Sequence, residues 1–384
     1  MPDLAAPARA GQRVGTLAPP GAALPDFPWD LLAPYAERAR AHPDGIVDLS
    51  IGTPVDPTPD VARNALSAAA NAPGYPTTIG TPALREAVAG WLARRFGISG
   101  VDPATSVLPT VGSKELVALL PTLLGAPRGS RVLHPPLAYP TYDVGARLAG
   151  AVPEPCPDLG DVDPAGVSLL WLNSPSNPTG AVMRPEELRR AVEWGRANGV
   201  VVVSDECYLE FGWDAEPRSV LHPDVRNGSF DGVLTVHSLS KRSNLAGYRA
   251  GFVVGDPALV GALLEVRKHA GLIVPAPVQA AMTAALGDDA HVDEQRARYL
   301  DRRARLRPAL EAAGFRIDAS TAGLYLWASD GSDCWSAVAR LAERGVLVAP
   351  GVFYGAAGAQ HVRVALTATD ERVDAAVERL AGSR

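Results

Sequence analysis

Short apolar runs that alternate with amphipathic segments limit most strongly how this chain can fold. Between residues 106 and 254 the chain has several runs rich in Val and Leu, and most of them are followed by a stretch with helical spacing of apolar residues. Runs that are apolar on both sides are typical of strands buried on both faces. The pattern therefore predicts an α/β fold with a mostly parallel sheet that is covered by helices.

The spacing of apolar residues also predicts the individual strands and helices. Strands are expected at 46–50, 106–108, 131–134, 168–172, 200–203, 233–236 and 251–254. Helices are expected at 29–41, 59–70, 82–96, 113–124, 141–148 and 185–198, and helical patterns also cover 257–286 and 294–313.

The length of 384 residues exceeds that of a usual single domain, so we expect two domains. After Gly314 the expected strands are 315–318, 324–327, 346–348 and 361–366, with helices at 335–344 and 371–381. We predict a large domain at 46–290 and a smaller C-terminal α/β domain at 291–384. The N-terminal segment, residues 1–45, is expected to contribute to the small domain.

Composition excludes several classes of protein. The 36 basic and 42 acidic residues give a net charge of −6, and no basic patch indicates binding to nucleic acid. The three cysteines, Cys156, Cys207 and Cys334, are far apart, so neither a disulfide framework nor a zinc site is indicated, which fits a cytoplasmic protein. No apolar run is long enough for a membrane span, so we expect a soluble protein with a loosely ordered leader over residues 1–25.

Polar residues follow several of the expected strands. Ligands bind at the carboxyl ends of strands in sheets of this kind. Gly112, Ser113 and Lys114 open a helix after a strand, where backbone N–H groups can bind an anion, although an ordinary helix cap would have the same pattern. Asp205 ends a buried strand, and a buried carboxylate requires a positive partner, either a protonated ring nitrogen or a core salt bridge.

The segment from Ser238 to Phe252 carries one lysine between hydroxyl residues and a second cation. Lys241 follows a buried strand, and Arg249 lies eight residues further on. A nucleophilic lysine beside hydroxyls and a guanidinium suits a phosphorylated aldehyde. A basic surface loop is the alternative interpretation.

Taken together and in order, these segments resemble one enzyme family. The runs NSPSNPTG (residues 173–180), SDECY (204–208) and SLSK (238–241), with Arg249 eight residues after the lysine, resemble the class I/II aminotransferases among the fold-type I pyridoxal-phosphate enzymes. The resemblance runs from about Ile46 to the C-terminus and implies a large domain with a seven-stranded, mostly parallel sheet. FPWDLL, HPDGIVDLSIGTPVDPTP and GAQHVRVALT further resemble the N-succinyl-L,L-diaminopimelate aminotransferase branch.

The resemblance implies a role for each matching residue toward pyridoxal 5′-phosphate. Lys241 would bond to the cofactor aldehyde and move the substrate's α proton. Asp205 would pair with the pyridine nitrogen, and Asn177 and Tyr208 would donate to the ring oxygen. The phosphate would be held by Gly112, Ser113, Lys114, Ser238 and Arg249.

The remaining implied roles concern the ring, the partner subunit and the substrate. Tyr139 would stack on the cofactor ring, and Tyr75 would reach the phosphate of a neighbouring subunit, which implies a homodimer with shared active sites. Arg363 would bind the substrate α-carboxylate beside Asn177, and Gly52 would allow close approach of the backbone. No metal is implied.

The implied activity is a ping-pong transamination of small amino and keto acids in lysine and diaminopimelate biosynthesis. Glutamate would be the donor and N-succinyl-2-amino-6-oxopimelate the acceptor. Several alternatives stay open, because spacing identifies no residue for the distal end of the substrate. They are prephenate or aspartate, unsubstituted LL-diaminopimelate, and a pyridoxal-phosphate β-lyase or decarboxylase reaction.

A ligand-sensing domain of a transcription regulator is the non-enzymatic alternative, but the stretch before Ile46 is short for a DNA-binding domain. His237 and Cys207 are expected to be packed core residues.

Overall fold

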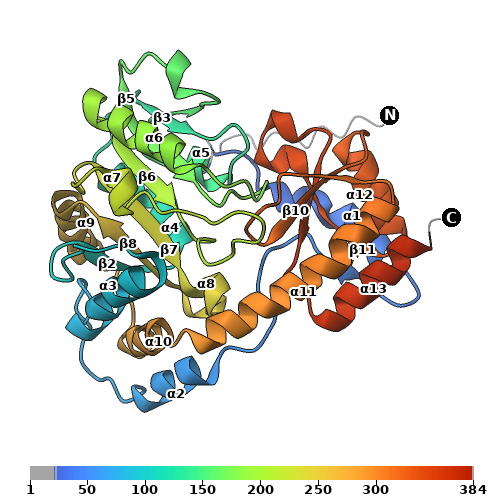
Figure 1. Ribbon diagram of the computed structural model, residues 1–384, viewed down its shortest axis with the longest axis horizontal. Coiled ribbons are helices and arrows are strands. Elements are labelled where there is room, and N and C mark those ends of the chain that lie inside the picture. The colour runs from blue at the N-terminus through green and yellow to red at the C-terminus, as the bar shows by residue number, and fades with distance from the viewer. Residues whose placement is uncertain (1–20, 22–23, 383–384) are drawn as a thin grey trace, which may run out of the picture.

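The computed structural model describes residue 21 and residues 24–382, and its larger part is built around a seven-stranded sheet (Figure 1). The strand order is β2-β8-β7-β6-β5-β3-β4. The strands are β2 (Val107–Val111), β3 (Arg131–His134), β4 (Val152–Pro155), β5 (Val167–Asn173), β6 (Val201–Asp205), β7 (Val233–Ser238) and β8 (Ala250–Gly255). Strand β8 is antiparallel to β2 and β7, and the other pairs are parallel. The predicted fold-type I α/β architecture with its mostly parallel sheet is confirmed.

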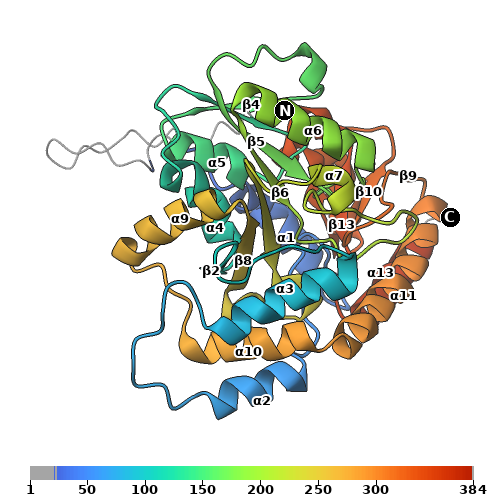
Figure 2. The same ribbon diagram turned by 60° about the vertical axis from the view of Figure 1, so that its left-hand side comes forward.

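Helices cover both faces of this sheet because successive residues of each strand point to opposite sides. In β5, Leu169 and Trp171 pack with α4 (Ser113–Leu123), α5 (Thr141–Leu148) and α9 (Pro257–Ala270), whereas Leu170 and Leu172 pack into the opposite core. That second core contains α3 (Pro82–Phe96), α6 (Pro185–Asn198), α7 (Pro223–Arg226) and α10 (Ala276–Gly287). Figure 2 shows α3 and α10 side by side, with α2 (Asp60–Ala68) against α10.

Several elements differ from the sequence-based expectation, and two of the differences have a clear local cause. Strand β4 was not expected: it is the exposed edge strand of the sheet, its sequence VPEP lacks an apolar run, and edge positions tolerate proline. The helical pattern at 257–286 forms two helices, because Gly271 takes a left-handed conformation (φ 69°) at the end of α9 and Pro275 precedes α10.

The C-terminal part contains a smaller, four-stranded antiparallel sheet with the order β12-β13-β10-β9. Its strands are β9 (Arg316–Asp318), β10 (Tyr325–Ser329), β12 (Ala349–Pro350) and β13 (Val362–Ala365). The helices around it are α1 (Ala33–Arg40), α11 (Ala290–Ala312), α12 (Cys334–Glu343) and α13 (Asp370–Ala381).

The N-terminal segment joins this smaller core. The short helix η2 (Pro28–Leu32) leads into α1, and β1 (Val47–Asp48) pairs in parallel with β11 (Val346–Leu347). The predicted domain limits at residues 45 and 290 stay predictions. The predicted leader, residues 1–25, lies outside the described residues except for residues 21, 24 and 25. Within the described chain, no helix is both long and apolar enough to cross a membrane.

Candidate active site

A pocket of about 360 Å³ lies where the carboxyl ends of the large sheet's strands meet the smaller sheet. Eleven of the residues predicted for the site line it: Gly52, Ser113, Lys114, Tyr139, Asn177, Asp205, Tyr208, Ser238, Lys241, Arg249 and Arg363. Gly112 lies directly beside the pocket, against Arg249. The remaining predicted residue, Tyr75, is fully exposed and lines no part of the pocket.

Asp205 lies buried at the end of β6. Its Oδ2 accepts a hydrogen bond from the hydroxyl of Tyr142 (2.9 Å), and its Oδ1 accepts one from the backbone N–H of Cys207 (3.2 Å). Burial raises the pKa of the Asp205 carboxyl, and these hydrogen bonds oppose that rise. No Lys or Arg of the described residues forms an ion pair with Asp205. The charge of Lys241 also opposes the rise, but a buried carboxylate that faces a pocket without an ion-pair partner fits a protonated ring nitrogen such as that of pyridoxal phosphate.

Lys241 lies in the one-turn helix α8 (Leu239–Arg242), which follows β7 directly. Ser238 caps this turn, because its Oγ accepts a hydrogen bond from the backbone N–H of Ser240 at 3.1 Å. The cap fixes the direction in which the chain leaves β7. Lys241, Ser238 and Ser240 all line the pocket.

The guanidinium of Arg249 lies against the turn where β2 leads into α4. Gly112 has φ 74° at the N-terminus of α4, and a Cβ at this position would lie 2.3 Å from Nη2 of Arg249. Glycine is therefore required for the guanidinium to lie against this helix end, where backbone N–H groups and the helix dipole favour a phosphate. The side chain of Lys114, the second residue of α4, places its Nζ 5.6 Å from the ring centroid of Phe27 and 5.8 Å from that of Tyr139.

Arg363 lies on β13 and is 3% exposed. Its Nη1 donates to Oδ1 of Asn177 (2.9 Å), and its Nη2 donates to the backbone carbonyl of Ser50 (2.7 Å). The guanidinium lies 4.0 Å from the ring centroid of Tyr325. No acidic side chain of the described residues pairs with Arg363. This buried, planar cation suits a carboxylate, which it can bind through two parallel hydrogen bonds.

Asn173, at the end of β5, holds the loop that contains Asn177. Its Oδ1 accepts from the backbone N–H of Asn177 (2.8 Å), and its Nδ2 donates to the carbonyl of Asp205 (3.0 Å). The peptide bonds Ser174–Pro175 and Asn177–Pro178 are cis. These contacts fix Asn177 between the ends of β5 and β6 and the guanidinium of Arg363.

Several residues of the pocket were not predicted from the sequence. Tyr142 and Tyr139 both belong to the run YPTY. Their spacing of about one helical turn is the sequence feature that could have indicated that both line the pocket. Tyr325 comes from an apolar strand that gives no such signal, yet its hydroxyl lies 2.8 Å from that of Tyr208. Burial, then the neighbouring Tyr325, raises the pKa of Tyr208 well above its usual value, so Tyr208 is a neutral donor. The other unpredicted lining residues include Phe27, Trp29 and Ile51.

His237 and Cys207 were both expected to be packed core residues. His237 is buried against Trp91 and Phe252, and burial lowers its pKa to about 3, which agrees with a packing role. Cys207 is partly buried, but it also lines the pocket beside Asp205, which the sequence did not indicate.

Comparison with known proteins places the chain in a family. Residues 44–380 match the model for "Aminotransferase class I and II". The chain is 62% identical to 4-dedimethylamino-4-oxo-anhydrotetracycline transaminase OxyQ of Streptomyces rimosus, over 93% of this chain and 99% of that protein. It is also 62% identical to probable aminotransferase Rv1178 of Mycobacterium tuberculosis, over 98% of this chain and 88% of that protein.

Solved structures agree with this assignment. A probable N-succinyldiaminopimelate aminotransferase from Thermus thermophilus superposes with a TM-score of 0.84 and 30% identity, covering 93% of this chain and 100% of that one. The succinyldiaminopimelate branch is thus represented among solved structures at lower identity, while the two relatives at 62% carry other names. The chain belongs to the class I and II aminotransferases, whose cofactor is pyridoxal 5′-phosphate.

Proposed function

We propose that this enzyme transfers the amino group of glutamate to N-succinyl-2-amino-6-oxopimelate, with 2-oxoglutarate and N-succinyl-L,L-diaminopimelate as products. The supporting observation is the charge balance of the pocket. Four cations, Lys114, Lys241, Arg249 and Arg363, face a single carboxylate, Asp205, and none of the four forms an ion pair with another described residue. Such a pocket favours several anionic groups at once, namely one phosphate and the carboxylates of whichever substrate is bound.

The residues present fit pyridoxal phosphate. Arg249 and the N-terminus of α4 would hold the phosphate, and Asp205 would pair with the ring nitrogen. When bound, the cofactor supplies an aldehyde for the amino group and a ring that withdraws electrons from the α-carbon. Asn177 and Tyr208 would donate to the ring oxygen, and the ring of Tyr139 would lie against the cofactor.

Two further roles complete the proposed site. Nζ of Lys241 would bond to the cofactor and, once released, remove the α proton of the donor and return a proton on the acceptor side. Arg363 would bind the α-carboxylate that donor and acceptor share, which aligns the bond to be broken. Tyr75 would act in the active site of a second subunit, and its full exposure is compatible with that role in a homodimer.

A second candidate acceptor is a polycyclic ketone. It is supported by the 62% identity to the anhydrotetracycline transaminase and by the aromatic side chains of Phe27, Trp29 and Tyr139 on the pocket wall. Flat rings favour stacking on such a wall.

Single half-reactions test the proposal. The cofactor-loaded enzyme is mixed with glutamate, and the aminated form is then mixed with each acceptor, while absorbance follows the cofactor. We expect conversion with glutamate and fastest return with the succinylated keto acid. Faster return with an anhydrotetracycline ketone would favour the second candidate. Equal rates for the succinylated acid and pyruvate would contradict the proposed acceptor, and pyruvate and ammonia released from cysteine without an acceptor would indicate a lyase.

A further inference from the structure

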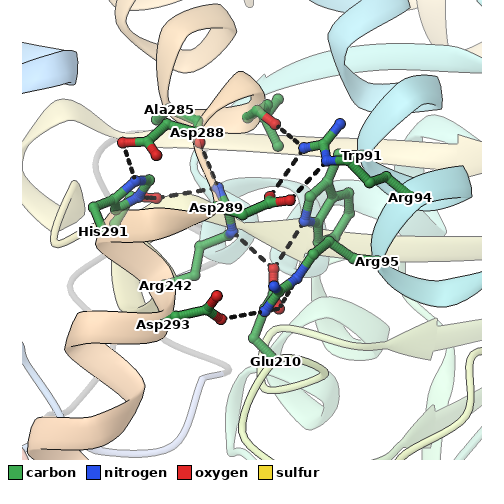
Figure 3. A network of polar contacts seen from close by, with 12 residues as sticks. Trp91, Arg94, Arg95, Glu210, Arg242, Ala285, Asp288, Asp289, His291 and Asp293 are labelled. Carbon is green, nitrogen blue, oxygen red and sulfur yellow. Dashed lines mark hydrogen bonds and ion pairs between the residues drawn. The ribbon is translucent and has the colours of Figure 1, made fainter.

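A buried cluster of charged side chains lies beside the pocket without lining it (Figure 3). Its centre is Glu210. The Oε1 of Glu210 accepts hydrogen bonds from Nε1 of Trp91 (2.8 Å) and Nε of Arg242 (3.2 Å), and its Oε2 accepts from Nη2 of Arg95 (3.0 Å). The side chains of Glu210 and Arg242 are only 5% and 3% exposed.

The ion pair between Glu210 and Arg242 joins the two chain segments that carry the predicted catalytic residues. Glu210 follows Asp205 and Tyr208 after β6, and Arg242 follows Lys241 in α8. Successive residues of a helical turn point about 100° apart. Lys241 accordingly lines the pocket, while Arg242 points away from it toward Glu210.

The turn that carries Lys241 is tied to other helices through the same cluster. Nη1 of Arg242 donates to the carbonyl of Ala285 in α10 (3.1 Å), and Ser243 Oγ lies 2.8 Å from Nε2 of His291 in α11. At the edge of the cluster, Arg94 donates to Asp289 (2.7 Å) without contacting either catalytic segment. Helices α10 and α11 therefore hold the turn that carries Lys241 from the side that faces away from the pocket.

Stability alone does not account for such an arrangement. The attraction within a buried ion pair is largely offset by the loss of hydration, and apolar residues of similar volume often give equal or greater stability. The directional hydrogen bonds of the pair do fix the relative position of the two segments that it joins. Misplacing a reacting group by about 1 Å can lower a rate by about 10²-fold.

We propose that Glu210 and Arg242 form a positioning pair that fixes Lys241 relative to Asp205 and Tyr208, and thereby sets the rate at which Lys241 reacts with the cofactor aldehyde. The inference rests on the proposed function, because it takes Lys241 as the residue that bonds to pyridoxal phosphate. It assigns to Arg242 and Glu210 no contact with cofactor or substrate.

The test uses full-length apoprotein mixed with pyridoxal 5′-phosphate. The variants are Arg242→Met, Arg242→Lys and the double variant Arg242→Met/Glu210→Leu, which leaves no unpaired charge from this pair. Arg94→Met is the matched control. It breaks the ion pair with Asp289 in the same cluster, where the side chain of Arg94 is 43% exposed. The readouts are the rate constant of cofactor capture, the pH midpoint of the bound cofactor's absorbance, and thermal unfolding of the apoprotein.

We expect Arg242→Met and the double variant to capture the cofactor at least about tenfold more slowly and to move the absorbance midpoint. Arg242→Lys should recover part of the rate, and Arg94→Met should stay within about twofold of the wild type. A double variant that unfolds like the wild type and also captures the cofactor at the wild-type rate with the same midpoint would overturn the inference.

A borohydride experiment separates this inference from the proposed function. Reduction should fix the cofactor covalently on Lys241 of the wild type, which mass spectrometry of peptides detects, and not on Lys241→Ala. If the wild type is not labelled at Lys241, the proposed role of Lys241 fails. If Lys241 is labelled and the Arg242 variants react like the wild type, only the positioning pair fails.

Discussion

At the scale of single residues, Gly52 shows how closely the pocket is packed beside Arg363 and Tyr325. A Cβ at this position would lie 2.1 Å from the hydroxyl of Tyr325. That hydroxyl contacts Tyr208, and the Tyr325 ring lies against the guanidinium of Arg363. The absence of a side chain at Gly52 therefore leaves room for Tyr325 to lie where it contacts both Tyr208 and Arg363.

Replacing Gly52 by alanine should displace the ring of Tyr325. We expect a loss of stability of about 1–3 kcal/mol from overpacking and a rise in KM for glutamate of about tenfold or more. The measurements are chemical denaturation and donor half-reaction kinetics.

Gly90→Ala serves as the control for this prediction. Gly90 is exposed in α3, and a Cβ there would meet no atom within 4 Å. Alanine should leave KM unchanged and stabilise the helix by up to about 1 kcal/mol. A Gly52→Ala protein with the stability and KM of the wild type would contradict the packing argument.

At the scale of elements, the end of β6 carries a second buried carboxyl next to Asp205. Glu206 accepts a hydrogen bond from the backbone N–H of Val220 (2.8 Å), and burial raises its pKa to about 8. In the unfolded chain its pKa is near 4.5. The folded state therefore binds the proton more tightly than the unfolded chain does. The contribution of Glu206 to the free energy of unfolding is full below pH 4.5 and is lost as pH rises toward 8.

This linkage predicts a pH dependence with a known sign. His237 has the opposite shift, since its folded pKa of about 3 lies below the ordinary value of 6.5, and it affects stability only below about pH 6.5. Between pH 6.5 and 8 the free energy of unfolding should fall with pH in the wild type and change less in Glu206→Gln. Urea denaturation at several pH values measures this, and identical slopes in the two proteins would refute the assignment.

The same scale shows what the sequence could predict. Strands buried on both faces, such as β5 and β7, are indicated by apolar runs, whereas β4 lies at an exposed edge and has no such run. Residues at the ends of strands, such as Asp205, were predicted to face a ligand because ligands bind at the carboxyl ends of the strands in such sheets. Tyr325 was missed because it reaches Tyr208 from 117 positions away, a contact that only the tertiary fold creates.

At the scale of the whole molecule, one buried arginine connects the two parts of the structure. Arg302 of α11 is 1% exposed and binds the carboxylate of Asp56 through Nη1 (2.8 Å) and Nη2 (2.6 Å), while its Nε donates to Asp370 of α13 (2.7 Å). Asp56 lies four residues after Gly52, so the segment that forms the pocket wall is tied to the helices of the smaller core.

Arg302→Met should leave Asp56, which is 9% exposed, without its ion-pair partner. We expect a loss of about 3–5 kcal/mol in the free energy of unfolding. On the same helix, Arg298 pairs with Glu294 at an exposed position, and Arg298→Met should cost less than about 1 kcal/mol. Denaturant titration compares the two variants. Equal losses in the free energy of unfolding would show that the buried Arg302 pair contributes no more than the exposed Arg298 pair.

The pairing of β1 with β11 has a consequence for how the chain is made. Val47 pairs with Val346, so 346 − 47 = 299 further residues must be synthesised before this partner exists. The large sheet, whose last strand ends at Gly255, can form during synthesis, but β1 stays unpaired until residues 346–347 have been added. Contacts of such long sequence separation form slowly. The last step of folding in the cell is thus expected to be the pairing of β1 with β11, which completes the smaller core.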